Sequence, residues 1–141
     1  MKEKHIQNEE LVFNMIQGQI GYDFKNLDLL KQAFVRRSYT EENGGEDNEV
    51  LEFIGDKVLD VIVVKLLTQK FGRLDNNNSV SSFTCDYDED ELTQLKSRMV
   101  QKKTLARRID ELNFADYISM KKSDIINNVN KEISVKEDLF E

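Results

Sequence analysis

The fold of this chain is decided by residues 48–71, which read NEVLEFIGDKVLDVIVVKLLTQKF. Apolar side chains recur there at intervals of three and four residues, the spacing that gathers them on one side of an α-helix. Asn48 precedes the pattern and Gly72 follows it, and these residue types are common at helix starts and helix stops. We therefore expect a central helix from about Asn48 to Phe71. Its expected buried face carries Leu51, Ile54, Val58, Leu59, Ile62 and Leu66.

Helical spacing also dominates the sequence on both sides of this helix. A first short helix is expected after Asn8, closed by Gly18 and Gly21. A terminal helix is expected from Ser134, which forms a capping-box pattern with Glu137. No alternating pattern is long enough to build a sheet, so the expected fold class is all-α. The other helices are expected over residues 26–34, 91–100 and 104–112, and loops over residues 39–47, 72–90 and 127–131.

Composition indicates one folded domain without a membrane span. The chain has 141 residues, of which 39% are hydrophobic, and we divide it into an N-terminal helix at 1–19 and a main domain at 20–141. The longest uncharged apolar run, residues 61–64, is far shorter than the roughly 20 residues that a membrane span needs. The first ten residues are charged, unlike a signal peptide. A soluble, cytoplasmic protein is expected.

Two residue types that often carry chemistry are rare in this chain. Cys85 is the only cysteine and His5 is the only histidine, which excludes an internal disulfide, Cys/His zinc sites and histidine-based triads. The net charge of −7 does not favour binding to a polyanion. A function on nucleic acid would therefore need a local basic surface or a bound cation.

Three acidic residues interrupt the most apolar helix. Glu49, Glu52 and Asp56 are spaced i, i+3 and i+7, which places them within about 60° of one another on the helix. About one such triplet is expected by chance in a chain of this length, so the apolar surroundings are the stronger signal. Burying unpaired carboxylates is costly, and divalent cations such as Mg²⁺ would neutralise them through oxygen ligands.

A second acidic pair lies on the expected terminal helix. Asp138 and Glu141 are spaced i, i+3, so two helices that each present carboxylates could close one oxygen-only site. A solvated charged face is the alternative interpretation for this pair. Asp60 falls on the same side of the central helix as Glu49, and we interpret it as a surface or interface charge.

A local basic run stands out in this acidic chain. No acidic residue interrupts it, and it is either a solvated face or a set of phosphate contacts beside the acidic site. Its members are Lys96, Arg98, Lys102, Lys103, Arg107 and Arg108.

These motifs carry a resemblance to a known family. Residues 48–60, NEVLEFIGDKVLD, resemble the signature helix of the ribonuclease III family, and residues 137–141, EDLFE, resemble the start of its second catalytic helix. Three further segments, residues 21–34, 37–39 and 91–100, are similar to the family in the expected order. The resemblance therefore covers roughly residues 20–141.

The resemblance implies an all-helical, homodimeric endoribonuclease domain that cuts double-stranded RNA with Mg²⁺, or with Mn²⁺ in its place. Products with 5′-phosphate and 3′-hydroxyl ends, and a role in cytoplasmic RNA processing without a small-molecule cofactor, are implied as well. Asp56 and Glu141 would be the residues most directly needed for hydrolysis, Glu49 would lie beside the site, and Phe53 would plug into the partner subunit. The implied metal ligands are Glu52, Asp56, Asp138 and Glu141, and the candidate RNA contacts are Lys96, Arg98, Lys102, Lys103 and Arg107.

The chain departs from the family pattern in three places. Arg36 replaces a histidine that the family often has, and residues 72–90 are longer and more acidic than the usual connection. The sequence stops at Glu141 with no double-stranded-RNA-binding domain after it, so a truncated catalytic domain is expected. Two alternatives stay open: a non-catalytic RNA-binding or dimerisation module, and an all-α nucleoside-triphosphate pyrophosphohydrolase.

Overall fold

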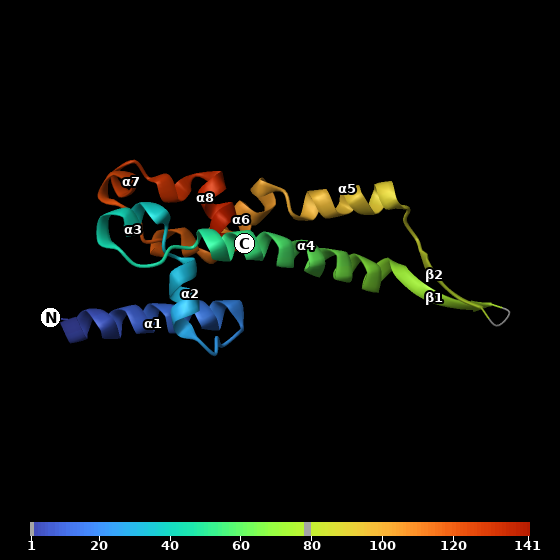
Figure 1. Ribbon diagram of the computed structural model, residues 1–141, viewed down its shortest axis with the longest axis horizontal. Helices are drawn as coiled ribbons and strands as arrows, with labels where there is room; N and C mark the ends of the chain where they lie inside the picture. Colours follow the sequence, from blue (N-terminus) through green and yellow to red (C-terminus); the bar gives the residue numbers. More distant parts are fainter. Residues whose placement is uncertain (1, 78–79) are drawn as a thin grey trace.

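Helices dominate the structure, a computed structural model that describes residues 2–77 and 80–141. The all-α fold class is confirmed (Figure 1). The α-helices are α1 (Lys2–Ile20), α2 (Leu27–Ala33), α3 (Arg37–Asn43), α4 (Glu49–Phe71), α5 (Glu89–Met99), α6 (Lys102–Leu112), α7 (Lys122–Ile126) and α8 (Ile133–Phe140). Two 3₁₀ turns, η1 (Phe114–Tyr117) and η2 (Val129–Lys131), and two strands, β1 (Gly72–Asn77) and β2 (Val80–Cys85), complete the elements.

The long helix α4 runs through the middle of the molecule (Figure 1). Its first half lies among α2, α3, α6 and α8, whereas its second half has α5 alongside. Beyond the ends of α4 and α5, β1 and β2 project as a two-stranded ribbon. The molecule is therefore dense at the start of α4 and thin at its end.

The hydrophobic core lies at the dense end. Ile16 of α1 is fully buried, and Phe34 packs edge-to-face against Phe13, with ring centroids 5.4 Å apart, and against Phe114, at 6.0 Å. Val135 of α8 belongs to the same cluster. This core joins α1, the end of α2, η1 and α8, and it holds α8 against the first half of the chain.

The boundaries of α4 agree with the sequence prediction. Asn48 is the N-cap residue and its side-chain amide donates to the carbonyl of Ala33 over 3.1 Å, while Gly72 follows the last helical residue. The predicted buried face was wrong for four residues. Ile54, Val58, Ile62 and Leu66 are 47–52% exposed, and the buried residues of α4 are instead Val63 and Leu67.

The reason is that α4 packs against α5 and α8 by its acidic side. At 100° per residue, Val63 and Leu67 share a side of the helix with Asp56 and Asp60. A lysine of α5, Lys96, bonds Asp60 across the two helices at 3.0 Å. The most apolar side of α4 therefore faces away from the rest of the chain.

Two short segments expected as loops are partly helical. Residues 39–47 were expected to be a loop, but α3 extends to Asn43 and ends only at Gly44 and Gly45, which have φ values of 73° and 96°. Within residues 127–131, η2 forms one 3₁₀ turn. The terminal helix exists as predicted, but Ser134 lies inside it and Glu132 is its N-cap residue, so the predicted capping box was wrong.

The prediction of a loop over residues 72–90 was also wrong. β1 and β2 pair antiparallel, with Gly72 opposite Cys85 and Leu74 opposite Phe83. Glycine is required at position 72, because a Cβ there would overlap the ring of Phe83 and lie 2.6 Å from the carbonyl oxygen of Thr68. The sequence did not reveal the strands, because most of their side chains are polar and each strand has only six residues.

Candidate active site

Helices α4 and α8 touch at a glycine. A Cβ on Gly55 would collide with the main-chain carbonyl group of Glu141, so only glycine permits this approach. Glu52 precedes Gly55 by three residues and Asp56 follows it directly, so the end of α8 is brought between these two carboxylates. The local sequence Glu-Phe-Ile-Gly-Asp thereby supplies both the acids and the gap that admits the second helix.

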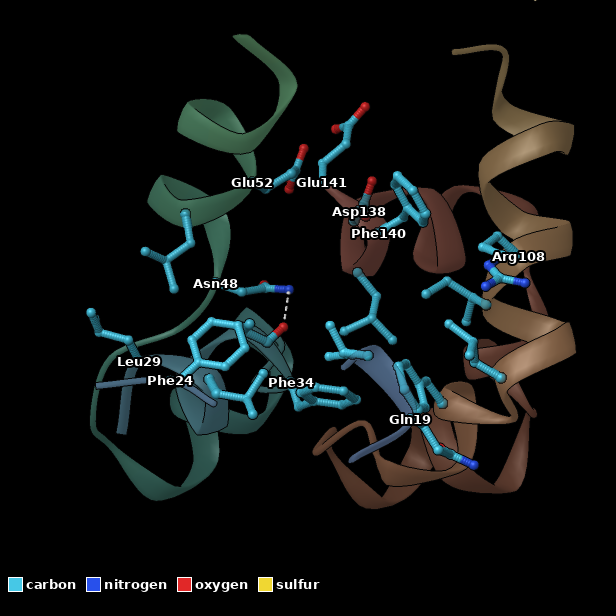
Figure 2. A pocket seen from close by; sticks show the side chains of 18 residues that line it. Gln19, Phe24, Leu29, Phe34, Asn48, Glu52, Arg108, Asp138, Phe140 and Glu141 are labelled. Atoms are coloured by element: carbon cyan, nitrogen blue, oxygen red, sulfur yellow. Dashed lines mark hydrogen bonds between the residues drawn. The ribbon is translucent and has the colours of Figure 1, made fainter. Parts of the chain in front are cut away.

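The acids of the two helices meet at the rim of one cavity. Glu52 of α4, Asp138 of α8 and Glu141 directly after α8 line a cavity of about 510 Å³, and their carboxylates lie near one another at its upper edge in Figure 2. Most of the remaining lining is apolar, with Phe34 below the acids and Phe140 beside Asp138 (Figure 2). Clustered acids beside an apolar lining are poorly solvated, and this raises the cost of keeping them all charged.

The pKa values of these acids are shifted upward. Burial raises the pKa of Glu141 to about 7, with additional repulsion from Asp56, Glu137, Glu52 and Asp138 in that order. Burial also raises the pKa of Glu52, and after burial the largest cause is the charge of Asp138. The pKa of Asp138 is raised by burial and by Glu137, against the opposing effect of Arg36 and Lys102. Acids of α4 and α8 therefore form one electrostatically coupled group.

The chemistry of this group fits a hard divalent cation. All four implied ligands are carboxylates, the oxygen donors that Mg²⁺ prefers, and a cation would relieve the repulsion that helps to raise the pKa values of Glu52, Asp138 and Glu141. Within residues 2–77 and 80–141, no three of the Asp, Glu, His or Cys side chains are placed closely enough to hold a metal ion together. Binding a metal ion here would bring the acids closer against their mutual repulsion, since two like charges 4 Å apart cost about 4 kcal/mol at an effective dielectric constant of 20.

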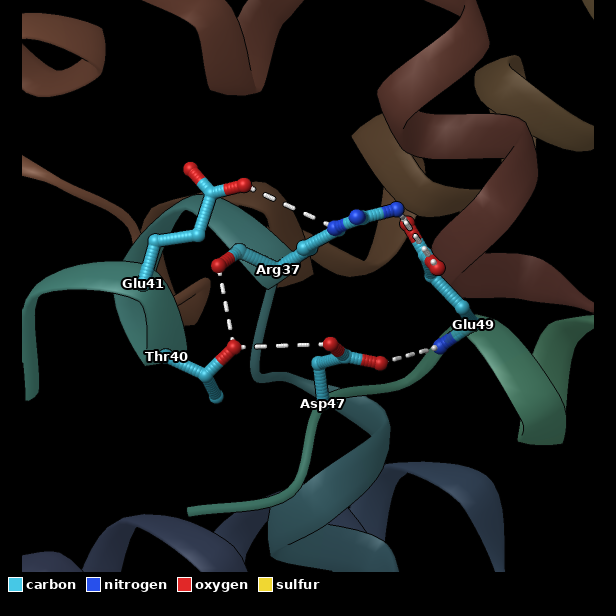
Figure 3. Close-up of polar contacts among 5 residues, drawn as sticks. All are labelled: Arg37, Thr40, Glu41, Asp47 and Glu49. Atoms are coloured by element: carbon cyan, nitrogen blue, oxygen red, sulfur yellow. Dashed lines mark hydrogen bonds and ion pairs between the residues drawn. The ribbon is translucent and has the colours of Figure 1, made fainter. Parts of the chain in front are cut away.

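Glu49 is held apart from the cavity by an arginine. Both of its carboxylate oxygens accept from Nη1 of Arg37 at 3.4 Å, and Nε of the same arginine lies 3.5 Å from Glu41 (Figure 3). Asp47 accepts from the main-chain N–H of Glu49 at 3.1 Å and so fixes the first turn of α4. Glu49 still contributes to the raised pKa of Glu52, which places it beside the site rather than in it.

Phe53 and its neighbours form an exposed apolar surface on α4. Phe53 follows Glu52 in the sequence but points away from the cavity side of the helix, and it is 69% exposed. We define the α4 apolar face as the exposed residues Val50, Phe53, Ile54, Val58, Val61, Ile62 and Leu66. Contiguous apolar surface of this kind marks an interaction site more often than ordinary solvent-exposed surface.

The basic residues differ in what they contact. Lys102 of α6 bonds Glu137 at 2.6 Å, next to Asp138, and Lys96 is paired with Asp60. Arg107 lies 3.6 Å from Glu111, which Arg108 also bonds, at 2.9 Å, whereas Arg98 of α5 and Lys103 of α6 are exposed. Lys102 is therefore the member of the basic run that the structure ties most closely to the carboxylate site.

Three site residues were not singled out for this role from the sequence. Lys57 bonds Asp56 at 2.7 Å, Glu137 adds a fifth acidic charge to the group, and Arg36 pairs with Asp124 at 3.7 Å while lowering the pKa of Asp138. Direct adjacency to Asp56 and Asp138 was the available signal for Lys57 and Glu137. The contribution of Arg36 depends on tertiary packing that no local pattern shows.

Comparison with known proteins decides the family. A family model described as "Ribonuclease-III-like" matches residues 26–141, which include Glu52, Asp56, Asp138 and Glu141. The chain belongs to the ribonuclease III family. Two relatives named "Ribonuclease 3" are 51% identical over 94% of this chain, in Roseburia hominis, and 48% identical over 89% of it, in Treponema succinifaciens. The chain spans 40% and 33% of the lengths of these two proteins.

Solved structures agree with this family. The nuclease domain of ribonuclease III from Campylobacter jejuni, described as flexible in a region involved in dimer formation, superposes with a TM-score of 0.73 at 28% identity. The superposition covers 88% of this ribonuclease III-like chain and 76% of the other.

Among the described residues, no helix is both long and apolar enough to cross a membrane.

Proposed function

We propose that this chain is the catalytic domain of a metal-dependent endoribonuclease that cleaves double-stranded RNA. The observation that carries the proposal is the coupled carboxylate group at the contact of α4 and α8, in which burial and repulsion raise the pKa of Glu141 to about 7. The family relationship supports the same activity, because the relatives that match most of the chain are named Ribonuclease 3. Products with 5′-phosphate and 3′-hydroxyl ends, formed in cytoplasmic RNA processing, complete the proposal.

The carboxylates of the site would have separate roles. Glu52, Asp56, Asp138 and Glu141 would hold Mg²⁺ or Mn²⁺. When bound, the metal ion would lower the pKa of a coordinated water and stabilise charge on the phosphodiester. Glu141 is the acid whose charge the protein satisfies least, so it gains most from a nearby cation. Asp56 contacts Glu141 electrostatically from the other helix, and these two residues are proposed to be needed most directly for hydrolysis.

Positive charge near the site would orient the RNA. Lys102 and Lys103 begin α6 on the side of the molecule that carries Glu137, and Lys102 already bonds that acid. Phosphate contacts from lysine and arginine position a nucleic acid without reading its sequence. The proposed contacts are Lys96, Arg98, Lys102, Lys103 and Arg107. The cation bound by the carboxylates would reverse the local negative charge that otherwise repels RNA.

The α4 apolar face supports a homodimer. An apolar surface along a 23-residue helix is costly to leave in water, and a symmetric partner would cover it with an identical surface. Phe53 lies near the start of this face, next to Glu52 of the carboxylate site, so a partner there would also shield the site. The description of the Campylobacter jejuni nuclease domain mentions dimer formation, which supports the same arrangement here.

Cleavage of defined RNA tests the activity. The wild-type chain should cut long duplex RNA with Mg²⁺, and chelation should stop the reaction. Asp56→Asn should reduce cleavage by at least about 100-fold while the circular dichroism spectrum stays unchanged, because the substitution removes charge with little change in volume. Asp28→Asn, at an exposed acid on α2, is the matched control and should retain full activity.

Several outcomes would contradict this proposal. Equal cleavage in chelator, or undiminished cleavage by Asp56→Asn, would remove the carboxylate site from the reaction. Nucleoside triphosphates and matched single strands are run as parallel substrates. Hydrolysis of triphosphates without cleavage of the duplex would favour the pyrophosphohydrolase alternative, and binding of the duplex without cleavage would favour the non-catalytic module.

A further inference from the structure

The ribbon formed by residues 72–77 and 80–85 projects beyond the helices, and we call it the hairpin arm (Figure 1). Its base is fixed to both flanking helices. The rings of Phe71 and Tyr87 pack edge-to-face at 4.7 Å, and the N–H of Asp86 donates to the carbonyl of Phe71 at 3.0 Å. Each strand has six residues, so the arm is about 20 Å long from the rise of a strand. Its position is therefore fixed at the base, with most of its length away from the core.

The two faces of the hairpin arm differ in polarity. Leu74 and Phe83 lie opposite each other in the antiparallel register, so their side chains share one face, and they are 69% and 59% exposed. Neighbouring positions alternate to the other face, where the hydroxyl of Thr84 donates to Asp75 at 3.0 Å. Beyond Leu74 and Phe83 on their face, the hydroxyl of Ser81 donates to Asn76 at 2.6 Å, and on the other face Val80 is 70% exposed at the outer end of the strand. In the half of the arm nearer the helices, one face is thus polar while the other presents an exposed apolar pair.

A ribbon of this construction needs a covering surface. A two-stranded hairpin alone is marginally stable in water, and stable hairpins pack an apolar face against other elements. Leu74 and Phe83 supply such a face, but the contacts that anchor the described residues of the arm lie near its base: the Phe71–Tyr87 contact, the Asp86 bond to Phe71 and the ring of Phe83 over Gly72. The exposed apolar pair indicates that another molecule completes the packing.

The charge of the arm indicates whether the molecule that covers it is RNA or protein. Within residues 72–77 and 80–88 the single cation is Arg73, and it is paired with Asp86. Asp75, Asp86 and Asp88 make the segment acidic, which opposes contact with a phosphate backbone. An acidic ribbon with an apolar face is suited to a protein surface.

The position of the arm indicates which protein covers it. β1 begins at Gly72, directly after α4, so the α4 apolar face runs from Val50 through Leu66 and is followed on the same stretch of chain by Leu74. A second copy that covers the α4 apolar face by two-fold symmetry lies beside the whole helix, including its end, where the arm starts. We propose that the apolar face of the hairpin arm, Leu74 and Phe83, packs against the second copy of this chain and extends the dimer contact of α4. This inference rests on the proposed homodimer.

Dimer affinity tests the inference directly. Leu74→Ser combined with Phe83→Ser should raise the dimer dissociation constant by about 100-fold in sedimentation equilibrium, because a symmetric dimer loses both side chains twice. Ser82→Lys is the matched control: position 82 lies on the polar face opposite Asp75, so this variant should dimerise like the wild type. Circular dichroism of each variant confirms that the helices are retained.

A second measurement does not depend on stability. Benzoylphenylalanine in place of Phe83, in dimers mixed from ¹⁵N-labelled and unlabelled chains, should give crosslinks between a labelled and an unlabelled chain after irradiation. Crosslinks confined to one chain, or a dissociation constant unchanged in the double variant, would overturn the inference. Weaker binding to duplex RNA without any change in the dimer would assign the arm to RNA and overturn it as well.

The outcomes separate this inference from the proposed function. If the wild type dimerises and cleaves duplex RNA while the double variant dimerises equally well, only the role of the arm is wrong. If the double variant loses dimer affinity but the wild type cleaves no duplex RNA, the role of the arm stands and the proposed activity fails. A wild-type chain that remains monomeric at about 100 μM would overturn the role of the arm directly, whatever its activity.

Discussion

The two sides of α4 are used in opposite ways. The side with Asp56, Asp60, Val63 and Leu67 packs inside the chain, against α5 and α8, although half of these residues are acidic. The more apolar side, represented by Ile62, is left about half exposed. Hydrophobicity therefore identifies α4 as a helix that must be covered, but it does not say whether its own chain or another one covers each side.

The acids of α4 differ in whether a nearby cation balances their charge. Asp60 is matched by Lys96 and Asp56 by Lys57, so each has a cation within 3.0 Å. Glu52 lines the cavity with Asp138 and Glu141, and its pKa is raised by burial and then by the charge of Asp138. Asp56 and Asp60 thus each have a lysine partner, whereas burial and neighbouring acids raise the pKa values of Glu52 and Glu141.

The largest expected effect comes from truncating one side chain on each side of α4. Leu67→Ala removes a buried side chain and should lower the free energy of unfolding by about 2–5 kcal/mol, measured by urea denaturation at low protein concentration. Ile62→Ala removes a side chain that is 47% exposed and should cost less than about 1 kcal/mol under the same conditions.

Protein concentration sharpens this comparison. Raising it should increase the gap in stability between wild type and Ile62→Ala, because dimer formation stabilises the wild type by mass action. The corresponding gap for Leu67→Ala should persist at every concentration. Equal costs for the two variants at low concentration would show that both sides of α4 are buried within one chain.

A smaller effect is expected where α4 meets α8. Gly55→Ala places a Cβ against the main chain of Glu141 and should cost about 1–3 kcal/mol of stability, together with faster hydrogen exchange of the α8 amides. Gly18→Ala is the matched control, since a Cβ there meets nothing within 4 Å and alanine favours helix by up to about 1 kcal/mol. Unchanged α8 exchange in Gly55→Ala would mean that the two helices do not touch at Gly55.

Local patterns were sufficient for the elements that local interactions define. Asn48 and Gly72 stand at the ends of α4, and both ends were predictable from these residue types, although the Asn48 side chain bonds Ala33 and not the helix. The hairpin arm was not predictable, because its stability depends on contacts such as Leu74 with Phe83, nine positions away. The sequence also could not show that Ile54 and Ile62 face outward, since that depends on which side of α4 contacts α5 and α8.

The carboxylate site was likewise predictable where local patterns define it. Helical spacing and the family resemblance selected Glu52, Asp56, Asp138 and Glu141, and the structure brings acids of the two helices to one cavity. Their roles as metal ligands remain proposals. Glu137 was not selected, because its contribution arises from packing between α6 and α8, where Lys102 bonds it across 35 positions of sequence.

The smallest expected effect is the pH dependence of stability, which compares an acid of the cavity with an exposed acid of α2. The pKa of Glu141 is raised from 4.5 to about 7 in the folded chain, so the folded state binds more protons than the unfolded state between these pH values. The contribution of Glu141 to the free energy of unfolding, measured without divalent cations, should therefore be highest below pH 4.5. It should fall as pH rises toward 7. The raised pKa values of Glu52 and Asp138 act in the same direction.

A shift of this size corresponds to about 3 kcal/mol for a fully buried group, but Glu141 is only partly buried, and solvent screening reduces the expected change to about 1 kcal/mol. Urea denaturation from pH 4.5 to pH 8 in chelator measures this slope for the wild type, for Glu141→Gln and for the exposed control Asp28→Asn. Glu141→Gln should flatten the slope, because glutamine does not titrate, whereas Asp28→Asn should leave it unchanged. Added Mg²⁺ should flatten the wild-type slope as well, since a cation at the cavity favours the charged carboxylates. A wild-type slope that Glu141→Gln leaves intact would mean that the end of α8 is solvated like the rest of the surface, and the contrast between the cavity acid and the exposed acid would then be lost.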